Sequence, residues 1–354
     1  MQPQDTSNHT SSSNKRDLHD LTHDEISELI AELHQPAFRV KQLESWLWEQ
    51  NVSSYDEMSN LPKALRAALA ERYTLGGMRV VASQKSMDGS KKYLLGMEDG
   101  TTVECVGMPT GNRLAVCAST QAGCAMGCAF CATGAAGLTR SLTAAEIYDQ
   151  VTHVRDDFGM RVTSVVLMGQ GEPFANYEAS IAALRRLNSP TNGLGIGARH
   201  LTVSTCGIIP QITRFSKEPE QFTLAVSLHS AVQRTRDALM PGVKRFSLLR
   251  LYDAMGEYTN RTGRRPTYEY ALIKGVNDTD EELTYLCDFC RDTLCHVNII
   301  QLNEVPGSRF QPASPKRAED FVRRLGRVGV EATIRNSRGA DIDAACGQLR
   351  QRLG

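Results

Sequence analysis

The chain has 354 residues with 40 basic and 40 acidic side chains, so that its formal net charge is +0. Because no overall positive charge attracts it to nucleic acid or anionic lipid, any contact with RNA must come from local basic surfaces. Hydrophobic residues make up 41% of the chain. No apolar run approaches the roughly 20 residues that a membrane-spanning helix needs, and this excludes an integral membrane protein of the helical kind.

The first 22 residues contain no apolar stretch that could act as an export signal, and we expect them to form a disordered tail. The protein is therefore expected to be cytoplasmic. Its ten cysteines are then poor candidates for a disulfide framework, because the cytosol keeps thiols reduced. Metal binding or thiol chemistry is the better expectation.

Three segments follow the tail. Residues 23–78 carry apolar side chains every three or four positions and predict a small helical accessory domain. Residues 79–110 change to short strand patterns separated by Asp88-Gly89 and Asp99-Gly100, which are hairpin signals, and predict a β-meander linking the two larger parts.

Residues 111–354 alternate short strands with helices, the pattern of a parallel sheet wound by helices. We predict an α/β fold, a partial (βα)6 TIM-like barrel. Thr143 and Glu146 read as the capping box of one of its helices. The predicted strands are 114–119, 163–169, 200–205, 222–228, 267–273, 296–302 and 331–335.

Polar or glycine residues gather where several of these strands end. Barrel-like α/β folds keep their active sites at this edge, although loops of this kind are polar in any protein. The segments concerned are 169–173, 204–207, 227–230 and 302–303.

A cysteine cluster follows the first of these strands: Cys124, Cys128 and Cys131, spaced C-x3-C-x2-C on a glycine-rich loop. Three thiolates so close together can hold one iron–sulfur cube and leave one of its irons open for a ligand. Structural zinc normally takes four protein ligands, and no fourth cysteine or histidine is adjacent. Zinc and inert buried thiols remain the alternatives.

With Phe130 before the last cysteine, this run resembles the signature of the radical S-adenosylmethionine (SAM) superfamily. The resemblance implies a 4Fe-4S cluster whose open iron binds the amino and carboxylate groups of SAM. An electron from the cluster then cleaves SAM to a 5′-deoxyadenosyl radical.

From about residue 24 onward the chain resembles the RlmN/Cfr family of RNA adenine methyltransferases. Residues 36–66 are similar to the accessory domain of that family, 116–134 to its cluster loop and 338–351 to its C-terminal segment. Similar motifs lie between them in the same order: GQGEP, STCGIIP, SLHS, LMPGV, GVNDT and LNEVPG.

The resemblance implies methylation of carbon 2 of an adenine in 23S rRNA, with tRNA left open as a second substrate. It also implies a monomer, no membrane, and an electron donor such as flavodoxin or ferredoxin. RNA would bind through the accessory domain and local basic surfaces: Arg261, Arg264 and Arg265; Lys316 and Arg317; or Arg323, Arg324 and Arg327. A solvated helix face is the alternative for these residues.

The family's chemistry uses two SAM molecules per turnover. By resemblance, Cys346 takes a methyl group from the first, the radical from the second removes a hydrogen from it, and the resulting methylene radical adds to the adenine. Cys117 then attacks the Cys346 sulfur, which releases methylated RNA and leaves a Cys117–Cys346 disulfide. Glu104 would take the carbon-2 proton. The alternatives are structural cysteines and a solvated glutamate.

For SAM, the resemblance assigns Gly171 and Glu172 to the methionine amino group. Hydrogen bonds to ribose and adenine would come from Ser204, Ser227, His229 and Asn303. Loop capping is the alternative for these polar residues. We expect only structural roles for Cys105, Cys206, Cys287, Cys290 and Cys295.

Three other functions stay open at this point. Gln170 resembles the carbon-8 methyltransferases of the same family, which confer antibiotic resistance, whereas Pro173 resembles the carbon-2 enzymes. A non-catalytic iron–sulfur RNA-binding module and a zinc-stabilised protein are the alternatives from other classes.

Overall fold

The computed structural model describes residues 15–302, 309–335, 338 and 342, so most of the predicted tail lies outside the described residues. The chain divides into two compact units, residues 1–76 and residues 77–354. Each unit is described by itself below.

The smaller unit is helical, as its apolar periodicity predicts. Thr22 and Glu25 form a capping box at the start of α1, in which Glu25 N–H donates to Thr22 Oγ1 over 3.2 Å and Thr22 N–H donates to Glu25 over 2.7 Å. Leu29, Leu43 and Leu65 are buried between the helices. The elements are η1 (Leu18–Asp20), α1 (His23–Glu32), α2 (Phe38–Glu44), the π-helix η2 (Ser45–Glu49), η3 (Tyr55–Glu57), α3 (Lys63–Arg72), and the parallel pair β1 (Arg16–Asp17) and β2 (Tyr73–Thr74).

The larger unit begins with the predicted meander, whose two hairpin turns place Gly89 and Gly100 at φ of 84° and 81°. Its strands are β3 (Arg79–Lys85), β4 (Lys91–Gly96) and β5 (Thr102–Thr110), all antiparallel. β5 also pairs with β6, so the meander continues the core sheet. The predicted meander is thus also part of the core sheet, because the free edge of β5 satisfies its backbone groups on β6.

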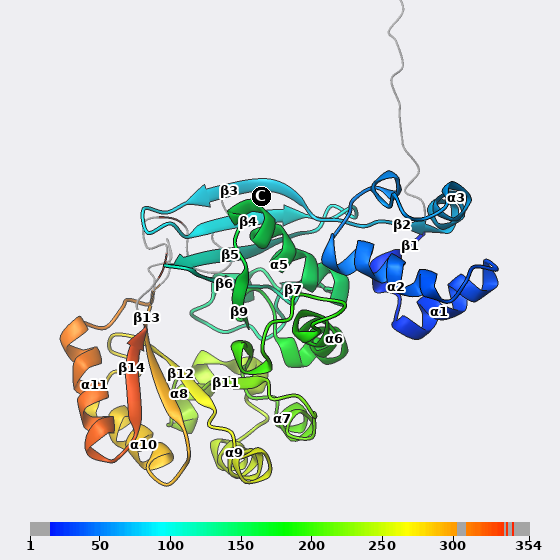
Figure 1. Cartoon of the computed structure of the whole chain (residues 1–354). Helices are drawn as coiled ribbons and strands as arrows, with labels where there is room; N and C mark the ends of the chain where they lie inside the picture. Colours follow the sequence, from blue (N-terminus) through cyan, green and yellow to red (C-terminus); the bar gives the residue numbers. More distant parts are fainter. Residues whose placement is uncertain (1–14, 303–308, 336–337, 339–341, 343–354) are drawn as a thin grey trace, which may run out of the picture. The chain divides into compact units, whose positions relative to one another are not determined.

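Seven parallel strands form the core, one at each predicted position, in the spatial order β14-β13-β12-β11-β10-β9-β6. Helices line the outer side of this curved sheet (Figure 1). The strands are β6 (Arg113–Cys117), β9 (Val162–Leu167), β10 (Leu201–Thr205), β11 (Thr223–Ser227), β12 (Thr267–Leu272), β13 (His296–Gln301) and β14 (Glu331–Arg335).

The helices follow the strands in the βα order that the sequence predicts, and α5 begins with the Thr143–Glu146 capping box. They are α4 (Ala132–Ala135), α5 (Ala144–Phe158), η4 (Pro173–Asn176), α6 (Tyr177–Asn188), η5 (Ala198–His200), α7 (Ile209–Phe215), α8 (Gln233–Leu239), η6 (Pro241–Val243), α9 (Leu248–Thr262), α10 (Asp280–Cys290) and α11 (Pro315–Arg327). In the described part of the chain, no helix combines the length and the apolar character needed to cross a bilayer.

Candidate active site

The cysteine loop connects two short antiparallel strands, β7 (Gln121–Gly123) and β8 (Leu138–Ser141). At its neck, Cys124 N–H donates to the Gly137 carbonyl over 2.8 Å. Gly123 has a φ of 82°, and a Cβ there would lie 2.0 Å from the Gly137 oxygen. The neck therefore requires glycine.

The other side of the loop is tied to the segment that follows β11. Ala129 N–H donates to the Leu239 carbonyl over 2.9 Å, and Gly242 N–H donates to the Met126 carbonyl over 3.0 Å. These bonds join residues more than a hundred positions apart. They hold the cysteines over the carboxyl ends of the core strands, where the sequence predicts the site.

Cys124, Cys128 and Cys131 line one cavity of about 400 Å³. This volume is in the range of small-molecule sites. Burial raises the pKa of the Cys124 thiol to about 11 and that of Cys128 to about 12, because it disfavours the thiolate. Within the described ranges, no three His, Cys, Asp or Glu side chains are placed to ligate a single metal ion. In an iron–sulfur cube each thiolate binds a different iron. Three thiols in one cavity wall are the type and number of ligands that a cube with one open iron takes.

Glu172 lies in the cavity wall, as predicted, with both carboxylate oxygens accepting backbone N–H groups. Phe174 N–H donates to Oε1 over 2.9 Å, and Cys206 N–H donates to Oε2 over 2.7 Å. Burial raises the pKa of Glu172, and these bonds oppose that rise. Glu172 thus holds the ends of β9 and β10 together beside the cavity. Gly171 has a φ of 98°, and a Cβ there would lie 2.5 Å from Gln121.

Ser204, Ser227 and His229 all line the same cavity. The backbone N–H of Ala271 donates to His229 Nδ1 over 3.0 Å, so the proton of the neutral ring belongs on Nε2. The ring meets the edge of Phe130 in the cysteine loop at a centroid distance of 4.8 Å. Asn303, the fourth predicted partner, lies outside the described residues.

Burial and, to a smaller extent, the nearby Arg236 lower the pKa of His229 to about 3. Its unfolded pKa is near 6.5, so the unfolded state binds more protons between pH 6.5 and 3 and stability falls as the pH falls. We expect the free energy of unfolding of the apoprotein to drop by about 2 kcal/mol from pH 7 to pH 5 on account of this residue. Urea unfolding at both pH values measures the drop.

The matched variants are His229→Asn, chosen because asparagine tolerates the positive φ of 54°, and His200→Asn at an exposed histidine. The extra loss at pH 5 should disappear in the first variant and persist in the second. An equal loss in both would contradict the assignment.

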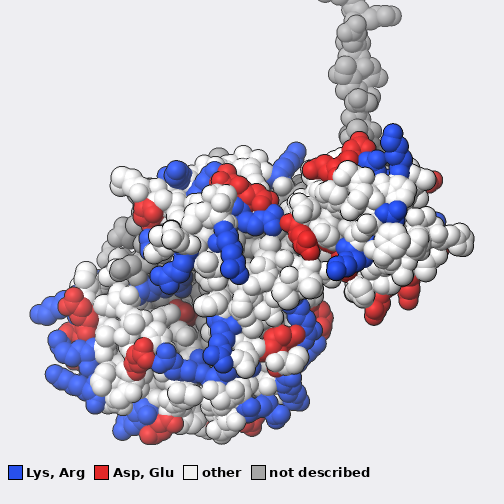
Figure 2. Space-filling model, in the orientation of Figure 1, with Lys and Arg blue, Asp and Glu red and all other residues white. Residues whose placement is uncertain are grey.

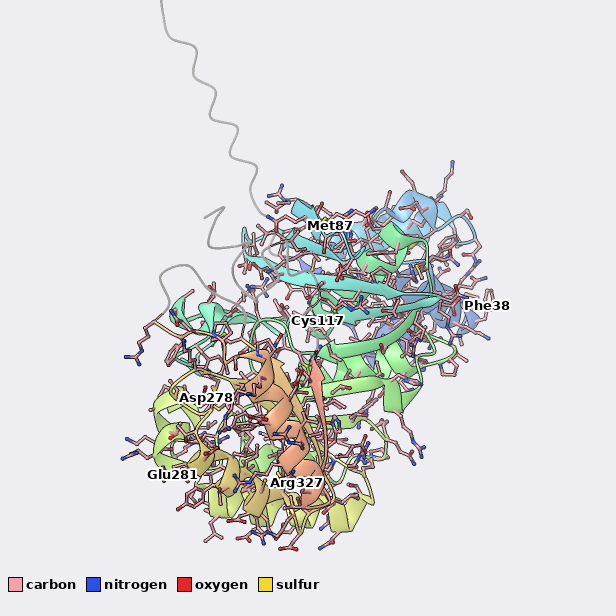
Figure 3. All side chains as sticks on the ribbon, turned by 90° about the vertical axis from the view of Figure 1, so that its left-hand side faces the viewer. Phe38, Met87, Cys117, Asp278, Glu281 and Arg327 are labelled. Atoms are coloured by element: carbon pink, nitrogen blue, oxygen red, sulfur yellow. The ribbon has the colours of Figure 1, made fainter. Side chains whose placement is uncertain are left out.

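Cys117 ends β6 and lines the cavity. Figure 3 shows it between the meander strands and the ends of the core strands. Within the described ranges, no disulfide joins two cysteines. Cys346 lies outside the described residues, and so does the predicted disulfide that it would form.

Glu104 lies in β5 with its side chain 3% exposed and paired to the Lys92 ammonium at 2.9 Å. The alternative of a solvated glutamate was therefore wrong. The signal in the sequence is an acidic residue inside the apolar strand pattern TVECVGM, which buries most of its side chains.

The cavity wall also contains three charged residues that the sequence analysis did not single out: Glu269, Arg335 and Arg338. Glu269 in β12 lines it, accepts from Asn298 Nδ2 over 3.1 Å through Oε1, and has no hydrogen-bond partner on Oε2 among the described residues. Arg335 and Arg338 line it as well. A glutamate in the otherwise apolar strand TYEYAL was the signal available for Glu269.

The remaining cysteines include Cys287, Cys290 and Cys295, which are buried on and just after α10. Cys206 differs from the expectation of a purely structural role, because it lines the cavity and its backbone N–H binds Glu172.

Several of the predicted basic side chains are committed to ion pairs. Arg265 pairs with Glu331, Arg317 with Asp280 and Arg323 with Asp320. The Arg317 and Arg323 pairs agree with solvated, charge-balanced helix faces, whereas Arg265 lies in the loop after α9 and Glu331 in β14. On the face drawn in Figure 2, Lys and Arg side chains border a hollowed region of the larger unit.

Comparison with known proteins identifies both units. Residues 16–75 match the ribosomal RNA large subunit methyltransferase N-terminal domain, and residues 118–287 match the Radical SAM superfamily. A protein of Desulforamulus reducens named probable dual-specificity RNA methyltransferase RlmN is 43% identical over 96% of this chain and 97% of its own length. One of the same name from Staphylococcus saprophyticus is 43% identical over 95% of this chain and 93% of its own.

Among solved structures, a radical SAM methyltransferase from Sphaerobacter thermophilus is 44% identical and superposes with a TM-score of 0.89 over 94% of this chain and 98% of that one. The predicted α/β radical SAM fold with its N-terminal domain is thereby confirmed. The Desulforamulus and Staphylococcus relatives carry the RlmN name and do not favour the carbon-8 branch. The chain belongs to the RlmN family of radical SAM RNA methyltransferases.

Proposed function

We propose that this enzyme methylates carbon 2 of an adenine in 23S rRNA, with tRNA as a second substrate, through a methyl group carried on Cys346. The observation that supports this most directly is the single cavity shared by the three cluster thiols, Cys117 and the strand-end residues Ser204, Ser227 and His229. A cofactor site alone would not need Cys117 in its wall.

Cys124, Cys128 and Cys131 would hold a 4Fe-4S cluster in the cavity wall. When bound, the cluster and SAM supply the electron and the 5′-deoxyadenosyl radical that this chemistry requires. The Nε2–H of His229 and the hydroxyls of Ser204 and Ser227 can donate hydrogen bonds to a nucleoside in the cavity. We assign Gly171 and Glu172 to the methionine end of SAM, beside the cluster loop.

The protein's own thiols would complete the methyl transfer. Carbon 2 of adenine lies between two ring nitrogens and is electron-poor, so it does not attack a methyl cation donor. Cys346 would instead carry the methyl carbon, spending one SAM as methyl donor and a second as radical source. Radical addition leaves one unpaired electron on the adduct, and this electron would return to the cluster as the carbon-2 proton leaves. The Cys117 thiolate then attacks the Cys346 sulfur, an S–S bond forms, and the C–S electron pair goes to the carbon, which takes up a proton.

The accessory domain of residues 23–78 would hold folded RNA, which proteins recognise by shape and by bases exposed in loops. The target adenine must leave its stack to enter the cavity. We further propose that the enzyme works as a cytoplasmic monomer and takes its electrons from a flavodoxin or ferredoxin.

The doubt about regiochemistry came from Gln170. This side chain is 1% exposed and buried beside the cavity, whereas Gly169, Gly171 and Glu172 around it line the cavity itself. The RlmN name of the curated relatives supports the carbon-2 product.

The test is mass spectrometry of rRNA from a host that lacks its own enzyme, with and without this gene. We expect 2-methyladenosine to appear only with the gene; 8-methyladenosine in its place would overturn the regiochemistry. In an anaerobic assay of cluster-loaded protein with reductant and SAM, failure to form both 5′-deoxyadenosine and methylated RNA would instead favour the non-catalytic binding module.

A further inference from the structure

The meander buries a lysine–glutamate pair next to the cavity. Lys92 Nζ lies 2.9 Å from Glu104 Oε2, and the two side chains are 1% and 3% exposed. Their neighbours Leu94, Leu95 and Val103 are buried apolar residues. Removing two charges from water costs about as much free energy as their mutual attraction returns. An apolar pair of similar volume would therefore stabilise the sheet at least as well. The pair therefore points to a role other than stability.

Strand register places the pair on the cavity face of the sheet. Val106 is directly opposite Lys92 in β4 and directly opposite Cys117 in β6. Glu104 precedes Val106 by two residues and so shares its face. It is the diagonal neighbour of both Lys92 and Cys117, a separation of about 7–8 Å that long side chains can bridge. Val106 and Cys117 line the cavity, whereas Lys92 and Glu104 share their face of the sheet and are buried beside them without lining it.

The backbone of Glu104 is fixed as well. The Ser119 hydroxyl donates to the Glu104 carbonyl over 2.6 Å and accepts from Gln170 N–H over 2.8 Å. Gln150 binds both the N–H and the carbonyl of Ser119, over 2.8 and 2.9 Å. The main chain of Glu104 is thus connected through Ser119 to Gln170 in the GQGEP loop, and its side chain is paired with Lys92. A general base needs this kind of fixed position.

We propose that Lys92 is a positioning residue that acts through Glu104. Its ammonium holds Glu104 as an oriented carboxylate on the cavity face, and Glu104 takes the carbon-2 proton of the RNA adduct. In that step the C–H bond breaks, an O–H bond to Glu104 forms, and the electron pair stays with the adenine ring. The carboxylate retains acceptor capacity while one oxygen binds Lys92. The inference rests on the proposed function.

The test compares Lys92→Met, Glu104→Gln and the double variant, each as full-length, cluster-loaded protein. Lys91→Met is the matched control, because Lys91 points to the opposite face of β4 and pairs with Asp157 at 2.9 Å. Each protein is mixed anaerobically with dithionite, SAM and a 23S rRNA transcript. Three products are measured: 5′-deoxyadenosine, the covalent protein–RNA adduct, and released methylated RNA.

We expect Lys92→Met and Glu104→Gln to form 5′-deoxyadenosine and the adduct, but to release methylated RNA at least about tenfold more slowly, as the loss of a general base predicts. The adduct should accumulate, and the KM for RNA should not change. Because Lys92 acts through Glu104, the double variant should be no slower than Glu104→Gln. Lys91→Met should release product like the wild type.

Release at the wild-type rate by Lys92→Met, or additive losses in the double variant, would overturn the proposal. Lys92→Met buries an unpaired carboxylate and could fail to fold for that reason. In that case Glu104→Gln is compared with the double variant. Equal release rates support the proposal, and slower release by the double variant refutes it. Wild-type release by Glu104→Gln would refute the base assignment. The proposed function fails separately, if wild-type protein forms neither 5′-deoxyadenosine nor methylated RNA.

Discussion

Replacing Cys346 with alanine is expected to abolish RNA methylation while SAM still binds the loaded cluster. The proposed route carries the transferred carbon on the Cys346 sulfur, so removing this sulfur removes the covalent carrier. We expect methylation to fall by at least about a thousandfold, the scale seen when a covalent nucleophile is removed. The measurement is incorporation of labelled methyl into a 23S rRNA transcript, alongside SAM binding to the same sample.

A cysteine-to-alanine change elsewhere provides the control. Cys287 is buried in α10 and does not line the cavity, so Cys287→Ala should keep its activity apart from a modest loss of stability. Full methylation by Cys346→Ala would rule out the thioether route. It would leave the assignment of the cluster untouched.

Replacing Cys128 with alanine is expected to remove both the cofactor and the activity. The cube would then have two protein thiolates in place of three. Cys128 is also the more buried thiol of this loop, since burial raises its pKa to about 12 and that of Cys124 to about 11. Iron content and visible charge-transfer absorption should fall to background, 5′-deoxyadenosine should not form, and methylation should drop by at least about a thousandfold.

The same measurements separate iron from zinc. Wild-type protein prepared anaerobically should contain iron and absorb visible light, whereas a zinc protein would be colourless. Cys295→Ala, near the end of α10, is the control and should keep its iron. If Cys128→Ala retained a full cluster, the three-cysteine assignment would be wrong.

Local sequence signals predicted much of the fold. The helical accessory unit, the hairpin turns of the meander and the seven core strands all follow from apolar periodicity and from turn or capping residues close together in the chain. The pairing of β5 with β6 was not predicted. A strand pattern tells which face of a strand is apolar, but not which free edge elsewhere will satisfy its backbone groups.

Some features of the candidate site could likewise be predicted from local sequence, and others could not. Cys124, Cys128 and Cys131 could be recognised because their spacing alone brings three thiols to one loop. Glu104 could be named from the family resemblance, but its pairing with Lys92 and the place of Glu269 in the cavity could not, because each depends on strands that are separate in the sequence. The same holds for His229, whose proton position depends on the backbone of Ala271, 42 residues away.

The sequence by itself determined the chemistry available to this protein: a three-thiol loop, further cysteines for thiol exchange, and polar residues at the ends of parallel strands. Only the tertiary structure decided how those groups are used. It determines which oxygen of Glu172 binds which amide, which nitrogen of His229 carries the proton, and which charge lies beside Glu104. The reason is physical. Residue identity fixes what a group can donate, accept or ligate, whereas burial and partner choice arise only when distant strands pack together.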